Sequence, residues 1–147
     1  MKDKKVLDRL RNDDDYYGEF GQQFLSNSNI RTLLTNPTEL RTPTPDNPNF
    51  KIGGYFHTMI LEPEKLKAFN VIDATSRNTR KYKTLAEDKV CILQHEVDNV
   101  EAMVKTVLGN SVCRDLIKPI LGSYEEPAVT DLFGNKWKGK ADIVNHD

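Results

Sequence analysis

The pattern of hydrophobic and polar residues changes its period along this chain. Apolar residues recur three and four positions apart in three segments, which predicts helices over about 28–36, 49–61 and 95–108. Near the end the apolar and polar residues alternate one by one, as is typical of strands. Because Gly134-Asn135 has the composition of a two-residue hairpin turn, we expect a β-hairpin over about 127–144.

The register of this hairpin decides which acidic residues meet. If Gly134-Asn135 form the loop, Asp142 falls opposite Pro127, and Glu125 is its diagonal neighbour on the same face. A register shifted by one residue would substitute Glu126 for Glu125. The other face of the second strand carries small and apolar residues and is expected to be the core face: Trp137, Gly139, Ala141 and Ile143.

Three further segments are less regular. Residues 1–15 combine a short amphipathic run with three consecutive aspartates, and we expect a frayed or flexible segment there. Residues 41–49 contain three prolines and are expected to form a loop within one domain. Residues 75–83 are polar and basic.

Composition narrows the class of protein. A chain of 147 residues fits one domain, 1–147, and its 37% hydrophobic and 29% charged residues are typical of globular proteins. A net charge of −1 argues against a general nucleic-acid coat, which needs a cationic surface. No apolar run approaches the length of a membrane span, and the charged N-terminus does not resemble a signal peptide, so we expect a cytoplasmic protein. Cys91 and Cys113 are then expected to be free thiols.

Two groups of residues are candidates for chemistry. Asp142, together with Glu125 or Glu126, offers the oxygen ligands that a hard divalent cation prefers, and nearby lysines on that face could contact phosphate: Lys138 and Lys140. His57 lies in a largely apolar predicted helix, where a single histidine is more typical of a core than of a metal site.

The basic stretch has two interpretations. It contains Arg77, Arg80, Lys81 and Lys83, with Tyr82 among them. Such a run is usually a solvated loop. Alternatively, its cationic side chains contact phosphate and Tyr82 stacks on a base.

Four segments in order resemble a known family, the phage-type PD-(D/E)XK exonucleases of the lambda-exonuclease, RecE and RecB-like group. The first resembles the opening S-x-S-x-[IL] helix of that family, and the second its G-x-x-x-H-x-x-[LI]-L-E-P helix. The third resembles the basic segment that follows, and the fourth the E…G-x-x-x-K-G-[RK]-x-D hairpin. In this chain they are Ser26 to Pro37, Gly53 to Pro63, Arg77 to Lys83, and Glu125 to Asp142.

This resemblance implies a fold and an activity. The fold would be α+β, the N-terminal part of a restriction-endonuclease-like fold, with helices followed by a β-hairpin and an incomplete core sheet. The activity would be a metal-dependent DNA exonuclease of phage recombination, acting in the host cytoplasm with Mg²⁺ or Mn²⁺. Asp142 would be the first catalytic aspartate and bind the metal, His57 would be the metal-site histidine, and Glu125 or Glu126 would be the other acidic residue of the site.

One departure from the family pattern changes these expectations. The family places a [DE]-x-K pair on the strand after the one that carries Asp142, whereas this sequence ends at Asn145-His146-Asp147. We therefore expect a fragment, from a truncated or split gene or a shortened chain, that is inactive alone. Its partners would be DNA and either a complementing C-terminal half or a second copy, paired through the exposed strand edge. The alternatives are a non-catalytic DNA- or protein-binding remnant of the nuclease fold, and an unrelated small α+β interaction protein.

Overall fold

The computed structural model describes residues 2–43 and 45–146. By their contacts these residues divide into two compact units, which are described separately: within the described ranges, unit 1 comprises residues 2–43 and 120–146, and unit 2 comprises residues 45–119. The single domain over 1–147 stays a prediction. None of the helices in the described ranges has the length and apolar character needed to cross a membrane.

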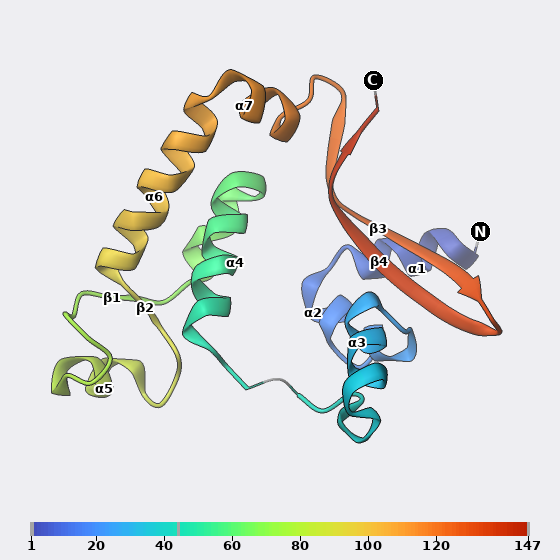
Figure 1. The fold of residues 1–147 in the computed structure, drawn as a ribbon, viewed down its shortest axis with the longest axis horizontal. Helices are drawn as coiled ribbons and strands as arrows, with labels where there is room; N and C mark the ends of the chain where they lie inside the picture. Colours follow the sequence, from blue (N-terminus) through green and yellow to red (C-terminus); the bar gives the residue numbers. More distant parts are fainter. Residues whose placement is uncertain (1, 44, 147) are drawn as a thin grey trace. The chain divides into compact units, whose positions relative to one another are not determined.

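Unit 1 is built on a long, twisted antiparallel hairpin (Figure 1). Its strands are β3 (Gly122–Leu132) and β4 (Asn135–Asn145). Its helices come from the N-terminal part of the chain: α1 (Lys2–Leu10), α2 (Asp13–Tyr17) and α3 (Asn27–Thr35), with single 3₁₀ turns at Gly21–Gln23 and Pro37–Glu39. The predicted helix over 28–36 and the predicted hairpin are therefore confirmed.

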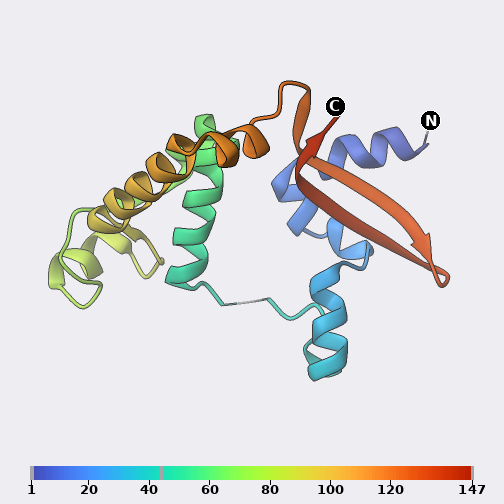
Figure 2. The same ribbon diagram turned by 45° about the horizontal axis from the view of Figure 1, so that its top comes forward.

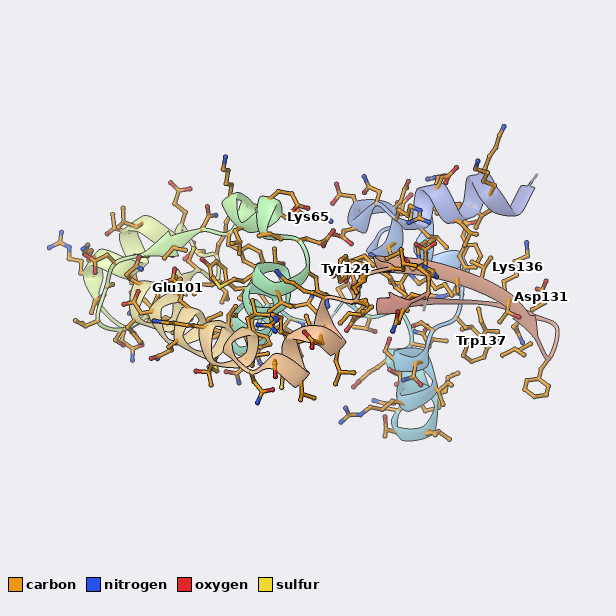
Figure 3. The ribbon with its side chains drawn as sticks, turned by 90° about the horizontal axis from the view of Figure 1, so that it is seen from above. Lys65, Glu101, Tyr124, Asp131, Lys136 and Trp137 are labelled. Carbon is orange, nitrogen blue, oxygen red and sulfur yellow. The ribbon has the colours of Figure 1, made fainter. Side chains whose placement is uncertain are left out.

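The turn of the hairpin lies one residue earlier than predicted. Its two central residues are Phe133 and Gly134, with φ of 53° and 74°, rather than Gly134 and Asn135. Positive φ at both positions is the geometry of a type I′ turn, whose twist matches that of the strands. Consequently Asp131 pairs with Lys136, and Figure 3 labels both side chains near the turn. Since the shift moves each partner by two residues, every side chain keeps its predicted face.

The N-terminal segment packs on the hairpin. Helix α1 lies beside β3, as Figure 2 also shows. Leu10 at the end of α1 is fully buried, and Tyr16 of α2 and Phe24 are nearly so. Leu25 forms a bridge to Trp137 of β4, with hydrogen bonds in both directions to the flanking backbone. The fraying predicted for residues 1–15 concerns motion and stays a prediction, while the described residues of this segment make defined contacts.

Unit 2 is mainly helical. Its elements are α4 (Pro48–Leu61), a 3₁₀ segment (Pro63–Ala68), β1 (Val71–Ile72), α5 (Arg80–Ala86), β2 (Ile92–Leu93), α6 (Gln94–Gly109) and α7 (Ser111–Ile117). The predicted helices over 49–61 and 95–108 are confirmed by α4 and α6. Helix α5 was missed by the sequence analysis: Thr79 caps it by accepting a hydrogen bond from the Tyr82 amide.

Two apolar clusters hold unit 2 together. In the first, Tyr55 of α4 packs with Ile92 and with one face of α6, formed by Val97, Val100 and Val104. The second joins β1, α5 and β2 through buried side chains: Ile72, Tyr82, Ala86, Cys91 and Leu93. Cys91 and Cys113 are free thiols, as predicted.

Candidate functional site

Two carboxylates face each other across the hairpin of unit 1. The ladder pairs Tyr124–Ile143 and Glu126–Ala141 flank a position at which Glu125 lies opposite Asp142. A carboxylate oxygen of Glu125 and one of Asp142 lie within 4.8 Å of each other. The corrected turn thus makes Glu125 the direct partner of Asp142, where the sequence predicted a diagonal neighbour.

The backbone of Glu125 is unusual for a strand residue. Its φ is 52°, in the left-handed region that disfavours residues with a Cβ atom. Holding a non-glycine residue there costs on the order of 1–3 kcal/mol, and such residues are frequent at functional sites. The local distortion falls at the point where the two carboxylates meet.

Glu126, the other candidate for the site, is engaged elsewhere. Arg11, which follows α1, donates two hydrogen bonds to its carboxylate, at 2.9 and 2.5 Å. This ion pair raises the pKa of Arg11, mainly through the hydrogen bond to Glu126. Of the two glutamates that the sequence left open, Glu125 is therefore the one that lies opposite Asp142.

Lys140 lies behind this carboxylate pair. Its ammonium group donates a hydrogen bond to Asp13 at 2.7 Å and lies 3.4 Å from Glu125, with the Tyr16 ring centroid 4.6 Å away. The Lys140 side chain is only 7% exposed. Burial alone would lower the pKa of Lys140, but the hydrogen bond and charge of Asp13, together with Glu125, outweigh it and raise that pKa. Lys140 therefore serves as an internal cation, a different role from the predicted surface contact with phosphate.

Lys138 is held in a similar way. Its ammonium group donates to the Tyr16 carbonyl oxygen and lies 4.0 Å from the centroid of the Tyr16 ring. Burial, and then the charge of Lys140, lower the pKa of Lys138. Gly21 allows this close approach, since a Cβ atom there would overlap the Tyr16 carbonyl and come within 2.5 Å of the Lys138 nitrogen.

The burial of the two faces of β4 differs from the prediction. The face that bears Lys138 and Lys140 is covered by α2. On the predicted core face, Trp137 and Ile143 are only half-buried, while Gly139 and Ala141 are exposed. The alternation of side chains was predicted correctly, but the Tyr16 ring packs against the two lysines rather than against the apolar face.

His57 belongs to the other unit. It lies in α4 and is half-buried. Its membership of a metal site stays a prediction from the family resemblance.

The basic stretch of unit 2 is only partly open to a ligand. Arg77 donates to both carboxylate oxygens of Glu96, at 2.7 and 2.6 Å, and to the Cys91 carbonyl at 3.2 Å. Tyr82 is buried and exchanges two hydrogen bonds with the Cys91 backbone, so the proposed stacking of this ring on a base is wrong. Three cationic side chains remain exposed on α5: Arg80, Lys81 and Lys83. Of these, Lys81 forms an exposed ion pair with Asp73 at 3.2 Å.

The chemistry of the pair Glu125 and Asp142 fits a hard divalent cation. Two oxygens bound to one Mg²⁺ at about 2.1 Å lie roughly 3 to 4.2 Å apart, so small side-chain rotations bring the pair within range. The Asp142 side chain is exposed to solvent, and Glu125 is half-buried. The arrangement can hold a cation at the surface of the hairpin.

The sequence analysis missed the N-terminal contributors to this region. Asp13, Arg11 and Tyr16 contact residues of the hairpin that are more than 100 positions away along the chain. A run of three aspartates is the only hint in the sequence, and nothing in it identifies a lysine of the hairpin as the partner.

One protein family matches this chain. The family is described as a PDDEXK-like domain of unknown function (DUF3799), and the match covers residues 25–147. It confirms the predicted resemblance to PD-(D/E)XK nucleases and the predicted fold class, while the phage exonuclease group stays a prediction. Such domains generally depend on a divalent metal ion. Comparison with curated proteins and with solved structures gives no match.

Proposed function

We propose a function from the premise that the chain belongs to the PDDEXK-like domain family of unknown function DUF3799. The proposed function is metal-dependent cleavage of DNA, with Glu125 and Asp142 as ligands of a divalent cation, Mg²⁺ or Mn²⁺. The observation that carries the proposal is the opposition of these two carboxylates, with oxygens within 4.8 Å, on the hairpin that resembles the nuclease motif.

We propose separate roles for the residues that would bind the metal ion and for those that would contact DNA. Glu125 and Asp142 would hold the cation, and His57 would join them as the resemblance implies. A cation bound there supplies activation of water and stabilisation of charge on the leaving oxygen of a phosphodiester. The exposed residues Arg80 and Lys83 would contact the DNA backbone, since exposed cationic side chains bind phosphate.

The proposed ligand set is small. It comprises two carboxylates and one histidine, and the affinity of a site for a hard cation grows with its number of charged ligands. We therefore expect weak binding of Mg²⁺ and no DNA cleavage by these residues alone. Cleavage would require a further acidic segment beside the hairpin edge, and a separate polypeptide that pairs with this edge could supply it to these 147 residues.

The resemblance extends the proposal to a substrate class. An exonuclease of phage recombination acts on linear duplex DNA in the host cytoplasm, and this is the substrate we propose. The second candidate function is binding of DNA or protein without catalysis by the same fold.

Metal binding tests the proposal directly. Titration of the purified chain with Mn²⁺, followed by calorimetry and by electron paramagnetic resonance, should show a saturable site that Asp142→Asn weakens at least tenfold. The matched control is Asp131→Asn, which removes the same kind of charge from the same hairpin about 20 Å away, six strand residues from Glu125. Equal Mn²⁺ affinity of wild type and Asp142→Asn would reject the site.

A DNA assay separates the two candidate functions. The chain is incubated with end-labelled linear duplex DNA and Mn²⁺, with and without a second polypeptide that supplies a D-x-K strand. Cleavage only in the mixture, abolished by Asp142→Asn, supports the nuclease. Retention of DNA on a gel without cleavage in either case supports the non-catalytic binding protein.

A further inference from the structure

The buried ammonium group of Lys140 is shared between two carboxylates. It hydrogen-bonds Asp13 at 2.7 Å and lies at the longer distance of 3.4 Å from Glu125. The Asp13 side chain is 46% exposed, whereas that of Glu125 is 16% exposed. Lys140 thus lies closer to Asp13, the more exposed of the two carboxylates, than to Glu125.

This division matters because a buried cation needs a counter-charge. An ammonium group removed from water is strongly destabilised unless a carboxylate compensates it. The Lys140 side chain is 7% exposed, and its ammonium group lies 4.6 Å from the Tyr16 ring centroid and 5.9 Å from that of Tyr17, so it has little access to water. Among the described residues, Lys140 forms ion pairs with Asp13 and Glu125. If Asp13 lost its charge, Glu125 would be the carboxylate that remains to compensate Lys140.

We infer that Asp13 is a positioning residue that keeps Lys140 at the longer distance of 3.4 Å from Glu125 and so limits competition between Lys140 and a divalent cation for the Glu125 carboxylate. The inference rests on the proposed function, in which Glu125 and Asp142 bind that cation. A lysine bonded fully to Glu125 would compete with the cation for the same oxygens, and its charge would repel the cation.

The segment that carries Asp13 is fixed on the hairpin by independent contacts. Arg11 forms its paired hydrogen bonds with Glu126, and the Tyr16 carbonyl accepts from Lys138. Asn12 caps α2, the helix that begins at Asp13, by accepting hydrogen bonds from the amides of Asp14 and Asp15. This segment precedes residues 25–147, which the family match covers, so the inference adds to the site a feature outside the matched domain.

The test is a set of Mn²⁺ affinities measured by calorimetry on the full chain. Asp13→Asn should weaken Mn²⁺ binding roughly tenfold, the lower end of the effect of residues that orient metal ligands. Asp13→Glu, which keeps the charge, should restore most of the affinity. Lys140→Gln should bind Mn²⁺ at least as tightly as wild type, because the competing cation is gone.

The double variant distinguishes this role from simple electrostatics. If Asp13 acts through Lys140, the double variant Asp13→Asn with Lys140→Gln should bind Mn²⁺ as tightly as Lys140→Gln alone. If Asp13 acted only as a distant negative charge, its roughly tenfold loss would persist in the double variant, and that result would overturn the inference. Should Asp13→Asn fail to fold by circular dichroism, weaker Mn²⁺ binding by Lys140→Gln would overturn it instead.

A metal-free measurement separates failure of the inference from failure of the proposed function. In a crystal structure of metal-free Asp13→Asn, the distance from the Lys140 ammonium to Glu125 should shorten from 3.4 Å to that of a direct hydrogen bond. An unchanged distance overturns the inference. If this distance shortens but the wild-type protein binds no Mn²⁺, the result supports the control of Lys140 by Asp13 and rejects the proposed metal site.

Discussion

The hydroxyl of Tyr82 offers a quantitative test of unit 2. In Tyr82→Phe, the ring remains buried but the hydroxyl that accepts from the Cys91 amide at 2.8 Å and donates to the Cys91 carbonyl at 3.1 Å is lost. The carbonyl keeps a second donor, because Arg77 also reaches it at 3.2 Å. Only the amide is left without its partner, and an unsatisfied buried group costs about 1–3 kcal/mol. We therefore expect a loss of about 2 kcal/mol in the free energy of unfolding of this unit.

The assay measures the affected amide itself. Hydrogen exchange of the Cys91 amide, followed by NMR, should accelerate roughly 30-fold in Tyr82→Phe, the equivalent of about 2 kcal/mol. The matched control is Tyr55→Phe, which alters another buried tyrosine of unit 2. Within the described part of the chain the Tyr55 hydroxyl makes no hydrogen bond, so a change of less than about 0.5 kcal/mol is expected there.

Two results would refute this reasoning. Unchanged protection of the Cys91 amide in Tyr82→Phe would mean that the hydroxyl does not satisfy it. An equal loss of stability in Tyr55→Phe would mean that the effect comes from packing of the rings rather than from the two hydrogen bonds.

Three further predictions concern other parts of the molecule. Burial opposes ionisation of Glu96, but hydrogen bonds from Arg77 and from the Leu93 amide outweigh it and lower the pKa of Glu96. The stability that the charged carboxylate contributes is therefore present above its ordinary pKa of 4.5 and is lost as the pH falls below that value. The thermal unfolding of Glu96→Gln should accordingly depend less on pH between about 5 and 3 than that of the wild type. Phe133 is 98% exposed and adopts a positive φ, so Phe133→Asn should raise the free energy of unfolding by about 1 kcal/mol in a urea titration, and a decrease would contradict the turn assignment. Gly21→Ala should lower stability by at least about 2 kcal/mol, because its new methyl group would overlap the Tyr16 carbonyl; a wild-type urea midpoint would count against the packing described here.

The regular elements were predictable because their patterns are local. The apolar face of α6 could be identified from Val97, Val100 and Val104 alone, since a period of 3.6 residues requires no knowledge of the partner. Helix α5 was missed because only two of its seven residues are buried, Tyr82 and Ala86. Two buried residues within a basic segment are too few to show the 3.6-residue hydrophobic period of a helix.

The acidic pair of the candidate site could be predicted from local alternation, but its contacts with distant residues could not. The opposition of two acidic residues on the hairpin follows from alternation, and the one-residue error in the turn moved the partner of Asp142 from Pro127 to Glu125 without changing its face. The burial of Lys140 could not be predicted, because it depends on Asp13, which lies 127 positions earlier in the chain. Spacing within a motif carries no information about such a partner.

The order of residues in unit 1 has a consequence for how the protein folds during synthesis. Helices α1 and α2 are synthesised before the strands that they contact, because Arg11 and Glu126 are 115 positions apart in the chain. At about 5–20 residues per second, the N-terminal segment waits roughly 6–20 seconds for its hairpin, while the intervening helices of unit 2 can already pack. Contacts between residues so far apart in the sequence form slowly, because the loop between them must first be closed. Until the hairpin arrives, Leu10 and Tyr16 remain exposed on the nascent chain, where a chaperone that binds apolar segments would find them.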